Sequence, residues 1–215
     1  MKIGQKFNSL IDIGVKTGMS VLPPPFSALF TAVYENTKES VLDKRAEKWK
    51  EQVIARLSKL ENDYEELISS EAFATALLKT SEIAVKTESE KKRELLANAL
   101  ANTFVNNVAE EKISIFLNLV EKYTLLHIEV LKFAHDEYQK QYYPESFVPT
   151  FWVMFKMRFP KIDDAYLTKA IKDLQNDFLI VDFKKDVPVQ TFGINKLELL
   201  TKLGNDFYDY LLSEV

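Results

Sequence analysis

The sequence contains no cysteine, which excludes disulfides, thiolate nucleophiles and every zinc site that uses thiolate ligands. A lack of cysteine is also compatible with a reducing compartment, so we expect the chain to be cytoplasmic. Glycine and proline are scarce as well, with five and seven copies among 215 residues. Because an all-β protein with many tight turns uses more of both, this scarcity predicts long helices with few connections.

Residues able to do chemistry are also few. The two histidines, His127 and His135, stand eight positions apart, which is ~12 Å along a helix and too far to share one metal ion. No two glycines lie closer than four positions apart, which argues against a glycine-rich phosphate loop, and there is no Gly-x-Ser-x-Gly nucleophile elbow. We therefore expect a protein that is not an enzyme, with no cofactor and no metal.

Long apolar runs are missing too. An uncharged stretch near the N-terminus, residues 19–33, includes three consecutive prolines at 23–25. A membrane helix needs ~20 apolar residues and would be broken by these prolines, so we do not expect a membrane partner. No signal-peptide pattern is present. We expect residues 1–34 to form an N-terminal segment that packs on the rest of the protein.

Residues 35–123 are predicted to form a helical domain. Apolar residues recur there at helical spacing, and further helices are expected over 71–86, 88–105 and 108–123. One stripe in the first helix has the alternating spacing of a coiled coil. Two interpretations of this stripe stay open, because it can pack on helices of the same chain or on a second copy. The stripe comprises Trp49, Val53, Leu57, Leu60, Tyr64 and Leu67.

Residues 124–215 show a different order of elements. Helices are expected over 125–139, 150–158 and 165–176, the last capped by Asp163 or Asp164. The pattern then becomes extended over 178–183, with a returning strand at 197–200 and a closing helix after Thr201. Three helices, a strand, a loop, a strand and a helix is the order of a winged helix-turn-helix. The sequence therefore predicts an all-α fold with a small β wing, in which a helical bundle precedes a C-terminal winged helix.

Two motifs strengthen this prediction. Leu200-Thr201-x-x-Gly204-x-x-Phe207 resembles the segment that follows the wing in many bacterial winged-helix regulators. Residues 119–127, running into Val130 and Leu131, resemble the helix entry of the same group. On these motifs residues 108–215 resemble the winged helix-turn-helix superfamily. The layout of the whole chain resembles uncharacterised bacterial and prophage-encoded helical proteins.

Charge separates the two functions that the resemblance implies. DNA contact uses Lys and Arg on the third helix and the wing, where Lys169, Lys172, Lys184 and Lys185 are the candidates. Yet residues 121–215 contain 12 basic and 15 acidic residues, and the net charge of the chain is −4. We therefore expect an interaction protein whose winged helix mediates protein–protein contact or homo-oligomerisation. The alternative is a DNA-binding transcriptional regulator of bacterial or prophage origin.

Overall fold

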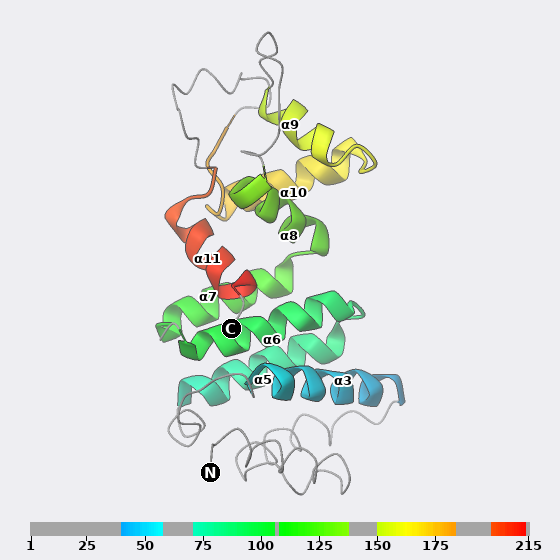
Figure 1. Ribbon diagram of the computed structural model, residues 1–215, viewed down its shortest axis with the longest axis vertical. Coiled ribbons are helices and arrows are strands. Elements are labelled where there is room, and N and C mark those ends of the chain that lie inside the picture. The colour runs from blue at the N-terminus through cyan, green and yellow to red at the C-terminus, as the bar shows by residue number, and fades with distance from the viewer. Residues whose placement is uncertain (1–39, 58–70, 106–107, 138–149, 184–198, 214–215) are drawn as a thin grey trace, which may run out of the picture. The chain divides into compact units, whose positions relative to one another are not determined.

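The computed structural model describes residues 40–57, 71–105, 108–137, 150–183 and 199–213 (Figure 1). Within these ranges the chain forms eight α-helices and one π-helical turn, and no strand. The expected mainly helical fold is therefore confirmed for the part of the chain that the structure describes. None of the described helices is long and apolar enough to cross a membrane.

The chain divides into two compact units, Met1–Glu121 with Tyr210–Val215, and Lys122–Asp209. The domains predicted at 35–123 and 124–215 stay predictions, and the predicted segment 1–34 lies outside the described residues.

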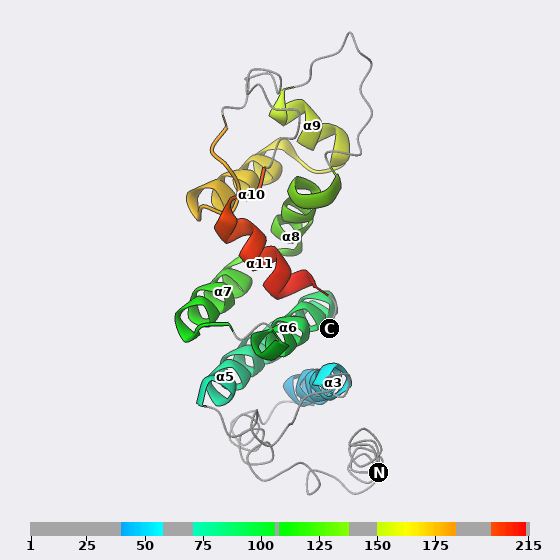
Figure 2. The same ribbon diagram turned by 60° about the vertical axis from the view of Figure 1, so that its left-hand side comes forward.

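The first unit is built on α3 (Ser40–Leu57), α5 (Glu71–Lys86) and α6 (Glu90–Val105), followed by α7 (Glu110–Lys122). The first three pack pairwise against one another, as Figures 1 and 2 show. Helix α6 is buried on almost every side, and its alanines allow neighbouring helices to approach closely. Its fully covered residues are Leu96, Ala97, Ala99, Leu100 and Ala101.

The described half of the predicted self-association stripe packs inside this unit. Trp49, Val53 and Leu57 expose 0%, 1% and 3% of their surface, and Trp49 Nε1 donates a hydrogen bond to Ser81 Oγ at 2.9 Å. These three side chains are already covered by the chain itself, which favours the intrachain alternative. Their predicted part in self-association stays a prediction. Leu60, Tyr64 and Leu67 lie outside the described residues.

The second unit comprises α8 (Leu125–Lys132), which continues as a π-helical turn (Phe133–Glu137), then α9 (Phe151–Arg158) and α10 (Asp164–Asn176). Helix α11 (Lys202–Leu212) begins here. Helices α8 and α10 pack against each other. Side-chain caps start α9 and α10, because Thr150 Oγ1 accepts from Val153 N at 3.3 Å and Asp163 Oδ1 from Ala165 N at 2.8 Å. The buried core includes Leu131, Phe155, Leu167, Leu174 and Phe207.

Two extended segments meet after α10. Ile180 and Leu200 form a single antiparallel bridge, flanked by hydrogen bonds from Val181 N to Leu199 O and from Thr201 N to Leu179 O. The segments predicted at 178–183 and 197–200 therefore pair at this point, but as one bridge rather than as strands. Residues 184–198 lie outside the described residues, so the β wing stays a prediction.

Candidate interaction surface

The turn between α9 and α10 is fixed by one lysine. Lys156 Nζ donates to Ile162 O at 2.7 Å and lies 2.5 Å from Asp164 Oδ1. Phe159 holds the turn from inside, since its ring packs edge-on against Phe133 with centroids 6.0 Å apart. The turn from α9 to α10 is therefore fixed by the contacts of Lys156 and by the buried ring of Phe159.

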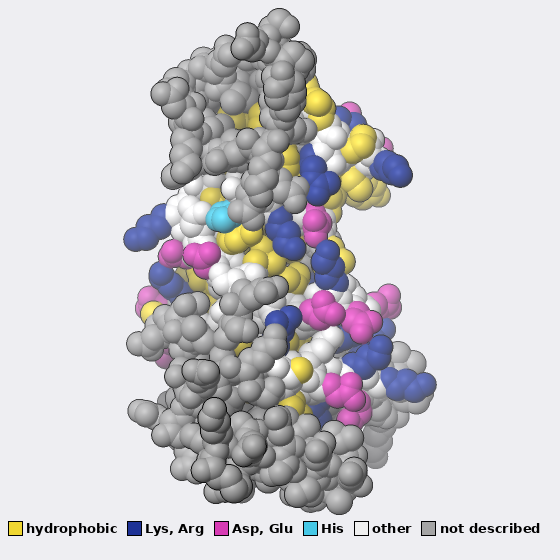
Figure 3. Space-filling model, in the orientation of Figure 1, with side chains coloured by type: hydrophobic (Ala, Val, Ile, Leu, Met, Phe, Trp, Pro, Cys, Tyr) yellow, Lys and Arg dark blue, Asp and Glu magenta, His cyan; other side chains and the backbone are white. Residues whose placement is uncertain are grey.

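On both sides of this turn in the sequence, apolar side chains face solvent. Met157 exposes 50% of its surface and Tyr166 exposes 71%. Figure 3 shows hydrophobic side chains at the surface where α9 turns into α10, with basic and acidic side chains beside them. Such a mixture of exposed aromatic, apolar and charged groups is typical of protein-contact surfaces.

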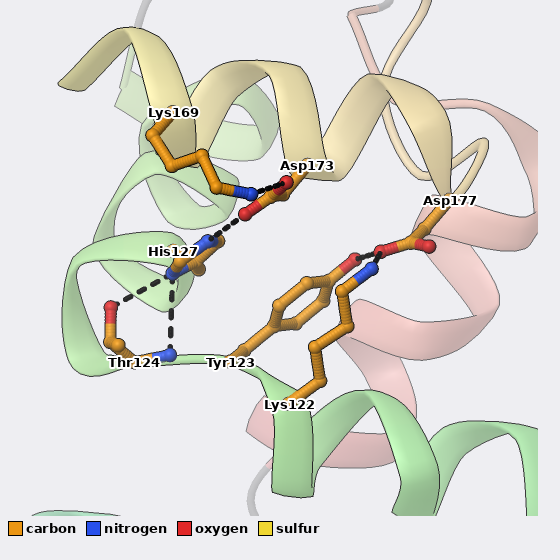
Figure 4. A network of polar contacts seen from close by, with 7 residues as sticks. All are labelled: Lys122, Tyr123, Thr124, His127, Lys169, Asp173 and Asp177. Atoms are coloured by element: carbon orange, nitrogen blue, oxygen red, sulfur yellow. Dashed lines mark hydrogen bonds and ion pairs between the residues drawn. The ribbon is translucent and has the colours of Figure 1, made fainter. Parts of the chain in front are cut away.

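His127 connects the start of α8 to α10 (Figure 4). Its Nδ1 accepts the backbone N–H of Thr124 at 3.2 Å and lies 2.8 Å from Thr124 Oγ1. A backbone N–H can only donate, so Nδ1 bears no proton in the neutral ring and Nε2 bears it. Nε2 then donates to Asp173 Oδ2 at 3.1 Å.

Asp173 also binds Lys169. The Lys169 ammonium donates to Asp173 Oδ1, while His127 occupies Oδ2. Burial opposes ionisation of Asp173, but the hydrogen bonds from Lys169 and His127 outweigh it and hold the pKa of Asp173 below its ordinary value. Asp173 therefore stays ionised at neutral pH and compensates the charge of Lys169.

Asp177 forms a second clamp one helical turn further on (Figure 4). Lys122 Nζ and the Tyr123 hydroxyl each lie 2.5 Å from Asp177 Oδ2. Burial, and then the Asp177 carboxylate, raise the pKa of Tyr123 above its ordinary value, so the phenol stays protonated and donates. The Tyr123 ring also stacks on His127, with centroids 4.9 Å apart.

This network has the order hydroxyl, imidazole, carboxylate through Thr124, His127 and Asp173, as in a catalytic triad. The contacts of His127 Nδ1 give this network a structural explanation instead. Nδ1 also takes the backbone N–H of Thr124, and this bond joins the residue before α8 to the third residue of that helix. We assign the network to positioning α8 against α10. No cluster of three or more metal-ligating side chains occurs among the residues that the structure describes.

The four lysines predicted to bind DNA differ in their ion pairs and in whether the structure describes them. Lys169 is exposed but ion-paired with Asp173, whereas Lys172 is exposed and has no ion pair within the described ranges. Lys184 and Lys185 lie outside the described residues. The pairing of Lys169 was detectable in the sequence, because positions i and i+4 of a helix face each other.

Phe178 was not singled out in the sequence. It follows α10 with a φ of 58°, and its side chain exposes 74% of its surface. Its backbone is held at both ends, because its N–H donates to Gln175 O at 3.0 Å and its carbonyl accepts from Thr201 Oγ1 at 2.5 Å.

The motif residues after the bridge form hydrogen bonds and close packing contacts. Thr201 Oγ1 accepts the N–H of Gly204 at 3.0 Å, which caps α11. Gly204 lies directly against the backbone of Leu179, where a Cβ atom would fall 1.9 Å from the carbonyl oxygen. Phe207 is fully buried and packs edge-on against Tyr123. The motif residues therefore join the start of α11 to the end of α10.

Comparisons of the chain with family models, with curated proteins and with solved structures find no match.

Proposed function

We propose that the chain is a non-enzymatic interaction protein whose winged-helix-like second unit contacts protein rather than nucleic acid. The observation that supports this most is the ion pair between Lys169 and Asp173 on α10. In the winged-helix arrangement α10 is the helix that would enter the major groove. There, a phosphate group would have to compete with the Asp173 carboxylate for Lys169.

The charges around α10 support the same conclusion. Asp164 is paired with Lys156, and Asp177 with Lys122, so lysines of this unit are engaged by its own acids. Lys161 and Lys172 are exposed and have no ion pair among the described residues. Two such lysines provide few phosphate contacts, and non-specific DNA affinity depends on the number of such contacts.

Exposed aromatic residues favour a protein partner. Tyr166 and Phe178 lie at the two ends of α10 and each exposes more than 70% of its surface. Truncation of aromatic anchors often causes the largest losses of affinity in protein interfaces. Both rings lie on a unit whose backbone is fixed by caps and by the bridge, so little ordering is needed on binding.

The alternative is the DNA-binding regulator that the resemblance implies. The order of α8, α9, α10, the antiparallel bridge and α11 favours it, as do the exposed Lys161 and Lys172. Binding would then use Lys169, Lys172, Lys184 and Lys185.

Titration of a fluorescent random duplex, followed by anisotropy at low and physiological salt, separates the two functions. Our proposal predicts negligible binding by the unmodified protein at physiological salt. Asp173→Asn frees Lys169 and should strengthen the weak low-salt binding, whereas the matched variant Lys169→Ala should not. Submicromolar binding that falls steeply with salt, and is lost when the four candidate lysines become Ala, would overturn the proposal.

A further inference from the structure

Phe178 combines a left-handed backbone with an exposed ring, and nothing in the fold requires a bulky side chain at this position. A φ of 58° places a bulky residue in the left-handed region, which glycine adopts without steric strain. The ring is also 74% exposed, so it adds little burial to the core. Glycine at this position, directly after a helix, would relieve the strain and the exposure together. A large exposed ring on a strained backbone indicates a role in binding a partner rather than in folding.

The backbone that carries the ring is held in place by hydrogen bonds. The backbone of Phe178 is fixed on one side by Gln175 and on the other by Thr201, and Leu179 N donates to Leu174 O at 2.9 Å. Thr201 in turn caps α11, which contacts Leu179 closely at Gly204. An anchor fixed before binding loses little conformational freedom on association.

Two charged residues that have no ion pair among the described residues flank α10 in the sequence. Lys161 precedes the helix, five positions before Tyr166, and Asp182 follows it, four positions after Phe178. Both are exposed and neither has an ion pair among the described residues. The net charge of the two flanking regions has the same signs as these two residues. Residues 156–164 contain three cations and two acids, whereas residues 172–182 contain one cation and three acids.

We propose that α10 and its two ends bind a second copy of the same chain, with the two α10 helices antiparallel about a two-fold axis. The residues that make this contact are Lys161, Tyr166, Phe178 and Asp182. In this arrangement Tyr166 meets the end of the partner helix that bears Phe178, and Lys161 meets the partner copy's Asp182, twice by symmetry. The helix dipoles are then antiparallel, which is favourable. This inference rests on the proposed function, because self-association is one form of the protein contact proposed there.

Sedimentation velocity over the micromolar range tests the anchor. The unmodified chain should approach twice the monomer mass as its concentration rises, whereas Phe178→Gly and Phe178→Ala should weaken dimerisation by about thirty-fold or more. Phe178→Gly should also melt at a higher temperature than Phe178→Ala, since only glycine relieves the strain. The matched control is Ile115→Ala, which removes an exposed apolar residue (48%) of the first unit and should dimerise normally.

Charge exchange tests the register. Lys161→Glu alone and Asp182→Lys alone should each weaken dimerisation, and the double variant should restore it. A chain that stays monomeric throughout, or dimers that survive both Phe178 substitutions, would overturn the inference. A monomer that also ignores DNA would refute this inference alone, whereas tight DNA binding refutes the proposed function.

Discussion

Replacing Gly204 by alanine tests how tightly α11 is joined to the end of α10. Glycine inside a helix is ordinarily less favourable than alanine, so Gly→Ala there stabilises by about 1 kcal/mol. At Gly204 the new Cβ would lie 1.9 Å from Leu179 O and 2.8 Å from the carbonyl carbon. Ordinary contact begins at 3.4 Å, so the two backbones must separate by about 1.5 Å.

That separation breaks specific interactions. The hydrogen bonds from Thr201 N to Leu179 O at 3.0 Å and from Thr201 Oγ1 to Phe178 O at 2.5 Å span the contact. Overpacking costs about 1–3 kcal/mol and each hydrogen bond about 1 kcal/mol, against the helix gain of about 1 kcal/mol. We therefore expect Gly204→Ala to lower the free energy of unfolding of the second unit by about 2–4 kcal/mol.

Urea unfolding followed by tryptophan fluorescence measures this loss. The chain has two tryptophans, Trp49 in the first unit and Trp152 in the second, so a Trp49→Phe background reports the second unit alone. Lys202→Ala, at an exposed position of the same helix, is the matched control and should be nearly neutral. A Gly204→Ala protein as stable as its parent would refute the close contact between α11 and Leu179.

Three further predictions concern a core leucine and two titratable side chains. Leu57→Ala should destabilise the first unit by about 2–5 kcal/mol in urea unfolding and leave the sedimentation coefficient at low concentration unchanged, because Leu57 is a core residue. The pKa of Asp173 is lowered in the folded protein, so its ionised form stabilises the fold above the pKa that it has in the unfolded chain. This stabilisation is lost as pH falls through the pKa of the folded protein, so Asp173→Asn should flatten the acid limb of a stability–pH profile. Burial raises the pKa of Tyr210 from its ordinary value of 10.0 to about 12. The stability that the neutral phenol contributes is therefore present below pH 10.0 and is lost as pH rises to about 12, and Tyr210→Phe should remove that loss from an alkaline denaturation series.

Local patterns predicted much of what the structure describes. Helical spacing placed α5 and α10 within one or two residues of their bounds, and Asp163 was one of two expected caps for α10. The short polar side chains of Asp163 and Thr201 satisfy free backbone N–H groups at helix starts, which explains why such local signals are informative. Thr201 also donates to the Phe178 carbonyl, and that contact was not visible from its position in the sequence.

Contacts across long sequence distances could not be predicted. His127 and Asp173 are 46 positions apart, and their pairing follows from the packing of α8 on α10. The pattern of 178–183 predicted an extended strand, but Phe178 takes a left-handed conformation because the chain reverses direction there to reach the bridge at Ile180. A conformation imposed by the surroundings of a residue has no signature in hydrophobic periodicity.

We propose that α10 and its ends contact protein rather than DNA, and sedimentation of the unmodified chain with a fluorescent random duplex separates these two cases. Absorbance of the protein and of the dye, recorded in one run at physiological salt, follows both components separately. We predict that the duplex sediments alone, while the protein shifts towards twice its monomer mass as its concentration rises. Duplex that sediments with the protein at submicromolar concentration, with the protein otherwise monomeric, would contradict the claim.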